Sequence, residues 1–149
     1  MKRFEFSLDR VLGFKNQMLD REKNELARLR MVKNQMDEEL KDLVKEFQSI
    51  SQQMTIKAQR GISALEMRSY QFQLDCLRDD MDLLNNKRHE QDLLIDQQLG
   101  VVLELSQSVS GLDKLKEHQM EEFAKYEAKV TENEIAEFIT GKLALAQEA

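Results

Sequence analysis

The sequence contains no proline and no tryptophan, and aromatic residues make up only 6% of its 149 residues. Proline breaks the interior of a helix, so its absence leaves room for long uninterrupted helices. Aromatic side chains normally supply much of the buried area of a globular core, so their scarcity disfavours a compact core. Charged residues reach 34%, a balance typical of long helices and coiled coils. The composition therefore predicts an all-α protein held by a narrow apolar seam.

The sequence also lacks long apolar runs and has a single cysteine, Cys76. One cysteine cannot form a disulfide within the chain, which fits a reducing compartment. No stretch approaches the roughly 20 apolar residues of a transmembrane helix. The first nine residues lack the apolar run of a signal peptide. We therefore expect a cytoplasmic protein.

The net charge of −6 is unevenly distributed along the chain. Residues 1–30 carry eight basic and five acidic side chains, whereas residues 61–149 carry nine basic and eighteen acidic ones. An acidic balance without a clustered basic face argues against a general nucleic-acid-binding protein. If the chain folds back on itself, its basic start and its acidic second half attract each other, which favours one orientation of the two halves.

Apolar residues recur at alternating spacings of three and four, which is the heptad repeat of a coiled coil. In the first half the repeat falls on Leu12, Lys15, Leu19, Glu22, Leu26, Leu29, Lys33, Met36, Leu40, Leu43, Phe47, Ile50 and Met54. In the second half it falls on Met67, Tyr70, Leu74, Leu77, Met81, Leu84, Arg88, Gln91, Ile95, Gln98, Val102, Leu105, Val109, Leu112, Lys116, Gln119, Phe123, Tyr126 and Val130. The polar members of this seam either fix the register of pairing or mark loose places where partners compete; they are Lys15, Glu22, Lys33, Arg88, Gln91 and Gln98.

Between the two repeats, the sequence predicts a turn at about residues 60–63. Gly61 suits the left-handed backbone at the end of a helix, and Ser63 followed by Glu66 is the capping-box pattern that starts one. A short turn between long helices makes them antiparallel neighbours. We therefore expect one domain, 1–149, formed by a long antiparallel two-helix coiled coil with helices at about 5–59 and 64–140. The alternative is one continuous helix that tolerates Gly61.

The predicted second helix is the longer one, so it overhangs the first from about residue 118 onward. Its apolar residues there have no partner helix, which indicates a bound protein or a dimer; they are Phe123, Tyr126, Val130, Ile135, Phe138 and Ile139. Gly100 and Gly111 lie inside this helix, where each weakens it by about 1 kcal/mol relative to alanine. A break near Ser110 and Gly111 is an alternative to a continuous helix.

No catalytic, nucleotide or metal site is visible in the sequence. The glycines are too scattered to form a phosphate-binding loop. His89 and His118 lie far apart and have no cysteines at metal-ligand spacing, so we expect both on the helix surface. Cys76 precedes the seam residue Leu77 and is interpreted as a packing residue. We expect a protein that is not an enzyme and that uses no cofactor and no metal.

Four phenylalanines, Phe4, Phe6, Phe14 and Phe72, fall outside the heptad positions. Burying such a ring stabilises a protein by about 2–3 kcal/mol, so an exposed one indicates a partner. Phe14 and Phe72 are the candidates for partner contacts. Alternatively, each ring folds back over its own hairpin.

Three segments resemble those of FliJ-family proteins. The opening Phe4-Glu5-Phe6-Ser7-Leu8-Asp9-Arg10-Val11-Leu12 is similar to the start of many members. The turn Gly61-Ile62-Ser63, followed by Tyr70 and by Leu74 through Leu77, is similar to their hairpin tip. The stretch Leu112-Asp113-Lys114-Leu115-Lys116-Glu117-His118-Gln119, followed by Glu121-Glu122-Phe123, is similar to the C-terminal part of their second helix.

This resemblance implies a cytoplasmic component of the flagellar type III export apparatus, peripherally associated with the inner membrane. Its partners would be the hexameric export ATPase, the cytoplasmic domain of the export-gate membrane protein, and export chaperones, without nucleic acid or a small-molecule substrate. The resemblance places gate contacts near the tip, at Phe47, Ile50, Tyr70, Phe72, Gln73 and Leu77. It places ATPase contacts at the end formed by the two termini, at Phe4, Phe6, Leu8, Leu12, Phe123, Tyr126, Val130 and Phe138.

Two other interpretations fit the same residues. One is a structural or dimerising coiled-coil adaptor with no link to an ATPase. The other is the equivalent component of a virulence type III secretion system.

Overall fold

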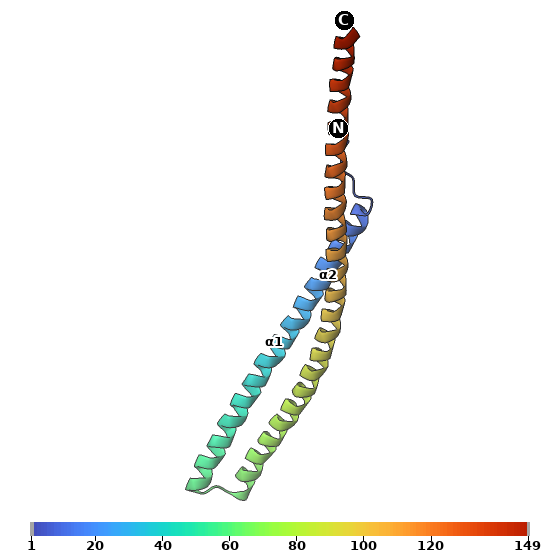
Figure 1. The fold of residues 1–149 in the computed structure, drawn as a ribbon. Coiled ribbons are helices and arrows are strands. Elements are labelled where there is room, and N and C mark those ends of the chain that lie inside the picture. The colour runs from blue at the N-terminus through green and yellow to red at the C-terminus, as the bar shows by residue number, and fades with distance from the viewer. Residues whose placement is uncertain (1, 149) are drawn as a thin grey trace. The chain divides into compact units, whose positions relative to one another are not determined.

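The structure is a computed structural model that describes residues 2–148. It contains two helices, α1 (Asp9–Arg60) and α2 (Ala64–Glu148), and the described part of the chain has no strand (Figure 1). The fold is thus an all-α helical hairpin whose second helix is the longer, as predicted. Both predicted outer bounds were wrong, because α1 begins at Asp9 instead of about residue 5 and α2 continues past residue 140 to Glu148.

Residue contacts divide the chain into two compact units. One unit is Asp20–Leu103, which contains the hairpin turn. The other joins the chain up to Leu19 with the chain from Glu104 onward. The expectation of a single domain stays a prediction.

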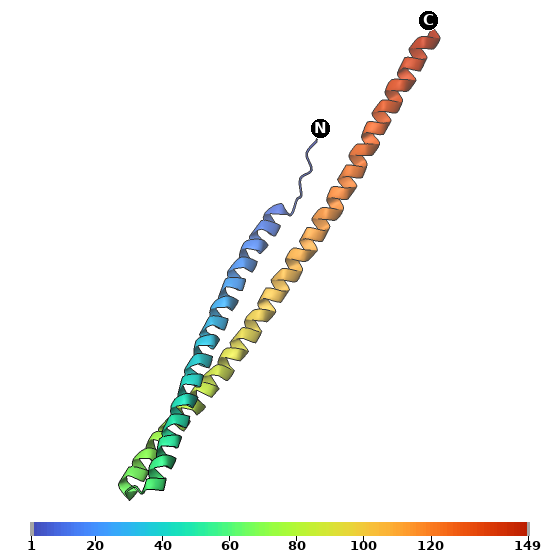
Figure 2. The same cartoon turned by 90° about the vertical axis from the view of Figure 1, so that its left-hand side faces the viewer.

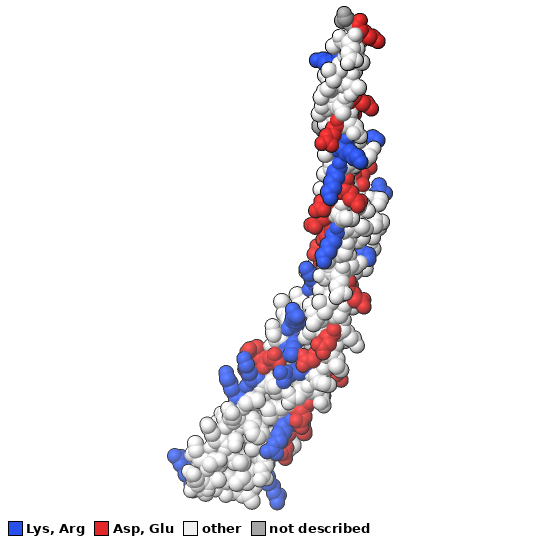
Figure 3. Space-filling view, viewed as in Figure 1, with Lys and Arg blue, Asp and Glu red and all other residues white. Residues whose placement is uncertain are grey.

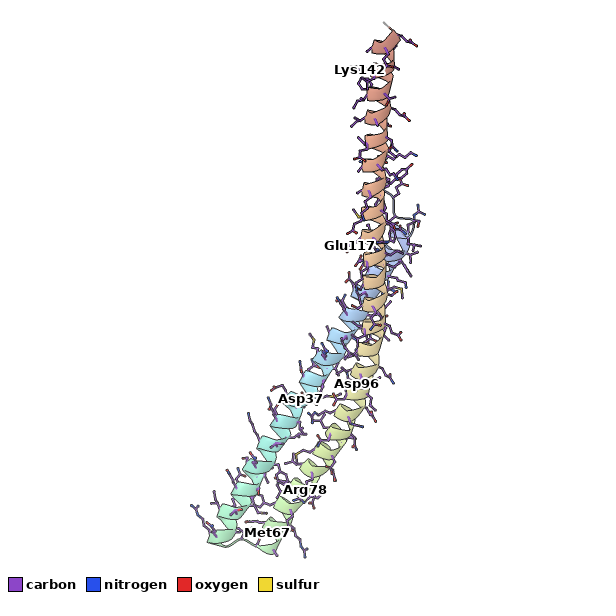
Figure 4. All side chains as sticks on the ribbon, in the orientation of Figure 1. Asp37, Met67, Arg78, Asp96, Glu117 and Lys142 are labelled. Carbon is purple, nitrogen blue, oxygen red and sulfur yellow. The ribbon has the colours of Figure 1, made fainter. Side chains whose placement is uncertain are left out.

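The hairpin turn forms where the sequence predicts it. Gly61 has a φ of +90°, a left-handed backbone conformation that residues with a Cβ rarely adopt. The turn therefore requires glycine at this position. The hydroxyl oxygen of Ser63 accepts a hydrogen bond from the backbone N–H of Glu66 at 3.2 Å. The carbonyl of Ser63 accepts the first helical bond, from Met67 at 3.1 Å, and Met67 lies beside the turn in Figure 4. The serine half of the predicted cap is therefore present.

The apolar seam of the Asp20–Leu103 unit follows the predicted heptad. Every predicted seam position of this unit is buried or half-buried, whereas most residues between them are exposed. Burying each aliphatic side chain stabilises the pairing by roughly 1.5–3 kcal/mol. The most buried apolar members are Leu26, Leu29, Leu74, Leu77, Leu84 and Val102.

The glutamines of this seam bond across to α1. Gln91 is buried, and its side-chain amide donates to the carbonyl of Leu29 at 2.9 Å. The amide of Gln98 donates to the carbonyl of Glu22 at 3.0 Å and also to its carboxylate. A shift of one helix along the other breaks these bonds. Their geometry favours the register interpretation over a loose seam.

The charged seam residues of the same unit are paired as well. Arg88 donates to the carboxylate of Asp37 at 2.7 Å, and Lys33 forms an ion pair with Asp92. These side chains are about one third to one half exposed, so water screens them and each pair contributes at most about 1 kcal/mol. Their main effect is on alignment.

The helix α2 runs without interruption through Gly100 and Gly111. The break considered near Ser110 is therefore not seen. Both glycines are exposed, and a Cβ added at either meets no atom within 4 Å. Neither glycine is needed for close packing of the described chain.

Candidate partner-binding surfaces

The chain before α1, residues 2–8, is not helical, and we call it the N-terminal strap. In an extended chain, side chains two positions apart point to the same side. On a helix, side chains two positions apart point in directions about 200° apart. Residues 2–6 of the strap have no helical assignment and residues 7–8 form a turn, so a helix does not force Phe4 and Phe6 to opposite sides. Phe6 is only 7% exposed and Phe4 is half-buried.

Three contacts hold the strap and the start of α1 to α2. The rings of Phe4 and Phe123 lie 5.7 Å apart between centroids and are tilted by 53°, a favourable aromatic arrangement. Lys116 forms an ion pair with Asp9 at 3.0 Å. Lys15 donates to the hydroxyl of Ser108. Around the strap lies a shallow recess lined by Phe4, Glu5, Phe6, Ser7, Asp9, Arg10 and Lys116.

The strap changes where the predicted overhang begins. An extended residue spans about 3.3 Å and a helical one about 1.5 Å, so the strap reaches farther along α2 than a helix would. Phe123 is half-buried under Phe4 and is not part of a free overhang. Val130 is also half-buried. The expectation that α2 is unpaired from about residue 118 was therefore wrong.

Tyr126 was also wrongly placed in the seam. It is 62% exposed, whereas the neighbouring Glu127 is half-buried. The heptad repeat averages 3.5 residues per turn, whereas a straight helix has 3.6. Where α2 no longer winds around another helix, the residues on its covered face therefore fall later than the heptad predicts, here at Glu127 instead of Tyr126. Around Phe123, α2 packs against the strap and not against α1.

Residues 131–148, which we call the C-terminal extension, are exposed throughout. Figure 2 shows this end of α2 without another helix beside it. The extension carries five large apolar side chains that are between 52% and 70% exposed: Ile135, Phe138, Ile139, Leu143 and Leu145. Such a concentration on one exposed helix indicates a surface that binds something.

Near the hairpin turn, a second recess brings together four of the predicted gate-contact residues. Ile50, Phe72, Gln73 and Leu77 line it with Glu46 and Cys76. Phe72 is 70% exposed and forms the projecting wall, while Leu77 is buried in the seam below. Phe72 thus does not fold back over its own hairpin.

The other two predicted tip residues lie outside this recess. Phe47 is half-buried, with the guanidinium of Arg78 5.5 Å from its ring centroid. Tyr70 is half-buried, with the ammonium of Lys57 5.4 Å from its ring centroid. Hydrogen bonding by the Tyr70 side chain raises the pKa of Lys57. Each ring therefore lies within cation–π distance of a basic side chain.

The prediction for Cys76 was wrong, whereas the two histidines lie on the helix surface as predicted. Cys76 is exposed and lines the tip recess, so its interpretation as a packing residue was wrong. His89 is exposed, and His118 is exposed with its Nε2 3.1 Å from Glu122. Phe14 is 61% exposed. The sequence signal for the exposure of Cys76 is its position one residue away from the seam residue Leu77.

The charges of the surface leave broad uncharged areas between them (Figure 3). Within residues 2–148, no group of three histidine, cysteine or acidic side chains could hold a metal ion. None of the helical residues that the structure describes forms a stretch long and apolar enough to cross a membrane.

Residues 4–139 match the model of a protein family described as Flagellar FliJ protein. The chain belongs to the FliJ family. The matched region runs from the strap through both helices and into the C-terminal extension. Searches of curated proteins and of solved structures give no match. Membership of the FliJ family, a non-enzymatic family, makes this chain a component of the flagellar export apparatus.

Proposed function

We propose that this FliJ-family chain is an accessory, stalk-like protein that promotes flagellar protein export by binding two partners. Its termini end binds the ring of the hexameric export ATPase. Its tip binds the cytoplasmic domain of the export-gate membrane protein, which holds it at the inner membrane. In this position it takes part in chaperone handling and in coupling export to the proton motive force.

The observation that carries this proposal is the C-terminal extension, a fully exposed helix with five large apolar side chains. Leaving each such side chain in water forgoes roughly 1.5–3 kcal/mol of burial, so a protein partner that covers several gains substantial affinity. A helix of this kind fits a groove or pore in a larger protein.

At the termini end, the candidate residues divide into two groups. Phe6 and Leu12 are buried, and Phe4, Phe123 and Val130 are half-buried, so these five hold the end together. The proposal therefore assigns direct ATPase contacts to the exposed members, which are Leu8, Tyr126 and Phe138.

At the tip, the proposal assigns the gate contact to the recess beside Phe72. Phe72 is the exposed aromatic anchor, and Ile50 and Gln73 flank it. Aromatic anchors beside a shallow recess are typical hot spots of protein interfaces. Phe47 and Tyr70 lie in the seam outside this recess, each near a cation.

A crossed binding experiment tests both assignments. We compare a chain that ends at Val130 with full-length Phe72→Ala, each against the purified ATPase and the purified gate domain. Every residue of 131–148 that the truncation removes is exposed, so the midpoint of its circular dichroism melting curve should match that of the full chain. We expect it to lose ATPase binding and keep gate binding, and Phe72→Ala to do the reverse.

The two arms serve as controls for each other. Retention of full ATPase affinity by the truncated chain would show that the termini end is wrongly assigned. Loss of both partners by Phe72→Ala would show that the tip does not act separately. Self-association of the full chain that disappears on truncation would favour the dimerising adaptor instead.

A further inference from the structure

A second heptad seam runs along the C-terminal part of α2, distinct from the seam that faces α1 and the strap. Its members follow spacings of four and three without a slip: Ala124, Ala128, Thr131, Ile135, Phe138, Lys142 and Leu145. All seven are exposed. Three heptads on one open face, with small or apolar residues at every position except Thr131 and Lys142, are the pattern of an unpaired coiled-coil helix.

This second seam does not continue the first. At 3.6 residues per turn, it lies roughly a third of a turn around the helix from Leu112, Phe123 and Val130. Continuing the first seam past Val130 in heptad spacing leads to Asn133 and Glu137, which are polar and exposed. A partner on the second seam therefore approaches α2 from a different side than the strap does.

Two side-chain contacts within the extension fit this assignment. The hydroxyl of Thr131 donates to the carbonyl of Glu127 at 2.9 Å, so its polar group is already bonded within the helix. The ammonium of Lys142, which Figure 4 labels, lies 5.0 Å from the ring centroid of Phe138, another seam residue. A single lysine at a seam position fixes the register and identity of a partner helix.

The charged residues that flank the seam are mainly acidic, and the other flanking positions are Ile139, Gly141 and Ala146. Glu127, Glu132 and Glu134 occupy the two flanking rows, with Lys125 as the basic exception. Within residues 2–148, none of these three glutamates forms an ion pair. In coiled coils, the flanking rows select the partner by charge.

A second copy of the chain fits this face poorly. In a parallel pair of copies, Glu127 faces Glu132 of the other chain on both sides. In the antiparallel pair of greatest overlap, Glu132 faces Glu132 and Glu134 faces Glu134. Either arrangement sets like charges beside the seam, which disfavours pairing.

We propose that the second seam binds a helix of a partner protein whose own apolar seam is flanked by lysine or arginine. The inference rests on the proposed function only in that the termini end has a protein partner. It adds the chemistry of that partner and the face of α2 that it covers.

Two designed helical peptides test the proposal against the full-length chain. Both carry three heptads with isoleucine and leucine in the seam; one has lysine and the other glutamate in the flanking rows. We expect the lysine peptide to bind about tenfold more tightly in fluorescence anisotropy, since it makes three favourable flanking pairs and one unfavourable pair with Lys125, and the glutamate peptide makes the reverse. Added salt should reduce the difference.

Leu145 and Leu143 supply a matched pair of variants. They are two residues apart and 70% and 60% exposed, but only Leu145 lies on the seam. We expect Leu145→Ala and Phe138→Ala to weaken the lysine peptide at least severalfold, and Leu143→Ala to leave it unchanged. Equal losses for the two leucine variants would indicate non-specific attraction and overturn the proposal.

The remaining outcomes are equally decisive. Equal affinity for both peptides, or none for either, would overturn the proposal. A dimer in sedimentation equilibrium that Phe138→Ala dissolves would show that a second copy covers the seam instead. If the peptides fail but the chain ending at Val130 still loses the ATPase, the proposed function stands and this inference alone falls.

Discussion

The two seams of α2 share the same seven-residue repeat but differ in what covers them. Leu84, Val102 and Val109 of the first seam are 7–8% exposed, whereas Ile135, Phe138 and Leu145 of the second are 54–70% exposed. The repeat alone therefore predicts an apolar face, and only the partner decides whether that face stabilises the fold. We expect the first seam to control stability and the second to control binding.

The largest effect that this comparison predicts is on core leucines. Leu84→Ala should lower the free energy of unfolding by roughly 2–5 kcal/mol, because the truncation leaves a cavity in a covered seam. Leu145→Ala should change it by less than about 0.5 kcal/mol, because its side chain is already in water. Urea unfolding followed by circular dichroism measures both. Similar losses for the two variants would mean that the second seam is covered in the isolated chain.

The covered seam was the part that sequence reasoning predicted well. Between Leu12 and Val130, every heptad position except Tyr126 is buried or half-buried. The turn was equally predictable, because Gly61 and Ser63 act through local backbone geometry.

The termini end was harder to predict, for two physical reasons. The strap is not helical, Phe4 contacts Phe123 far along the chain, and Phe6 is buried, and such long-range packing is not visible in local sequence. The spacing of two between Phe4 and Phe6 was the available signal. The second seam was missed because Ile135, Phe138 and Ile139 were grouped with the other apolar residues of the overhang, without a check of their own spacing.

The next effect concerns the strap, the element that keeps Phe123 covered. Phe4→Ala removes the aromatic pair with Phe123 and the apolar area that the half-buried ring covers. The free energy of opening the strap should therefore fall by about 1–2 kcal/mol. Trypsin cleavage after Arg10, and exchange of the Leu12 amide that bonds to Leu8 at 2.9 Å, should then accelerate roughly fivefold to thirtyfold.

Phe14→Ala is the matched control for this measurement. Phe14 is an aromatic residue near the same cleavage site, but it is 61% exposed. We expect its removal to leave both rates unchanged. If the two phenylalanine variants accelerate cleavage equally, the Phe4 contact does not hold the strap.

The smallest effect separates the two seams through their glycines. Gly111 lies in the stretch that α1 covers, Gly141 lies in the extension, and a Cβ added at either meets no atom within 4 Å. Gly111→Ala should raise the free energy of unfolding by about 0.5–1 kcal/mol, because alanine favours the helix. Gly141→Ala should increase the helical circular dichroism signal while leaving the urea midpoint unchanged, since the extension makes no contact that global unfolding breaks. An equal rise in midpoint for both variants would show that the extension unfolds together with the covered seam.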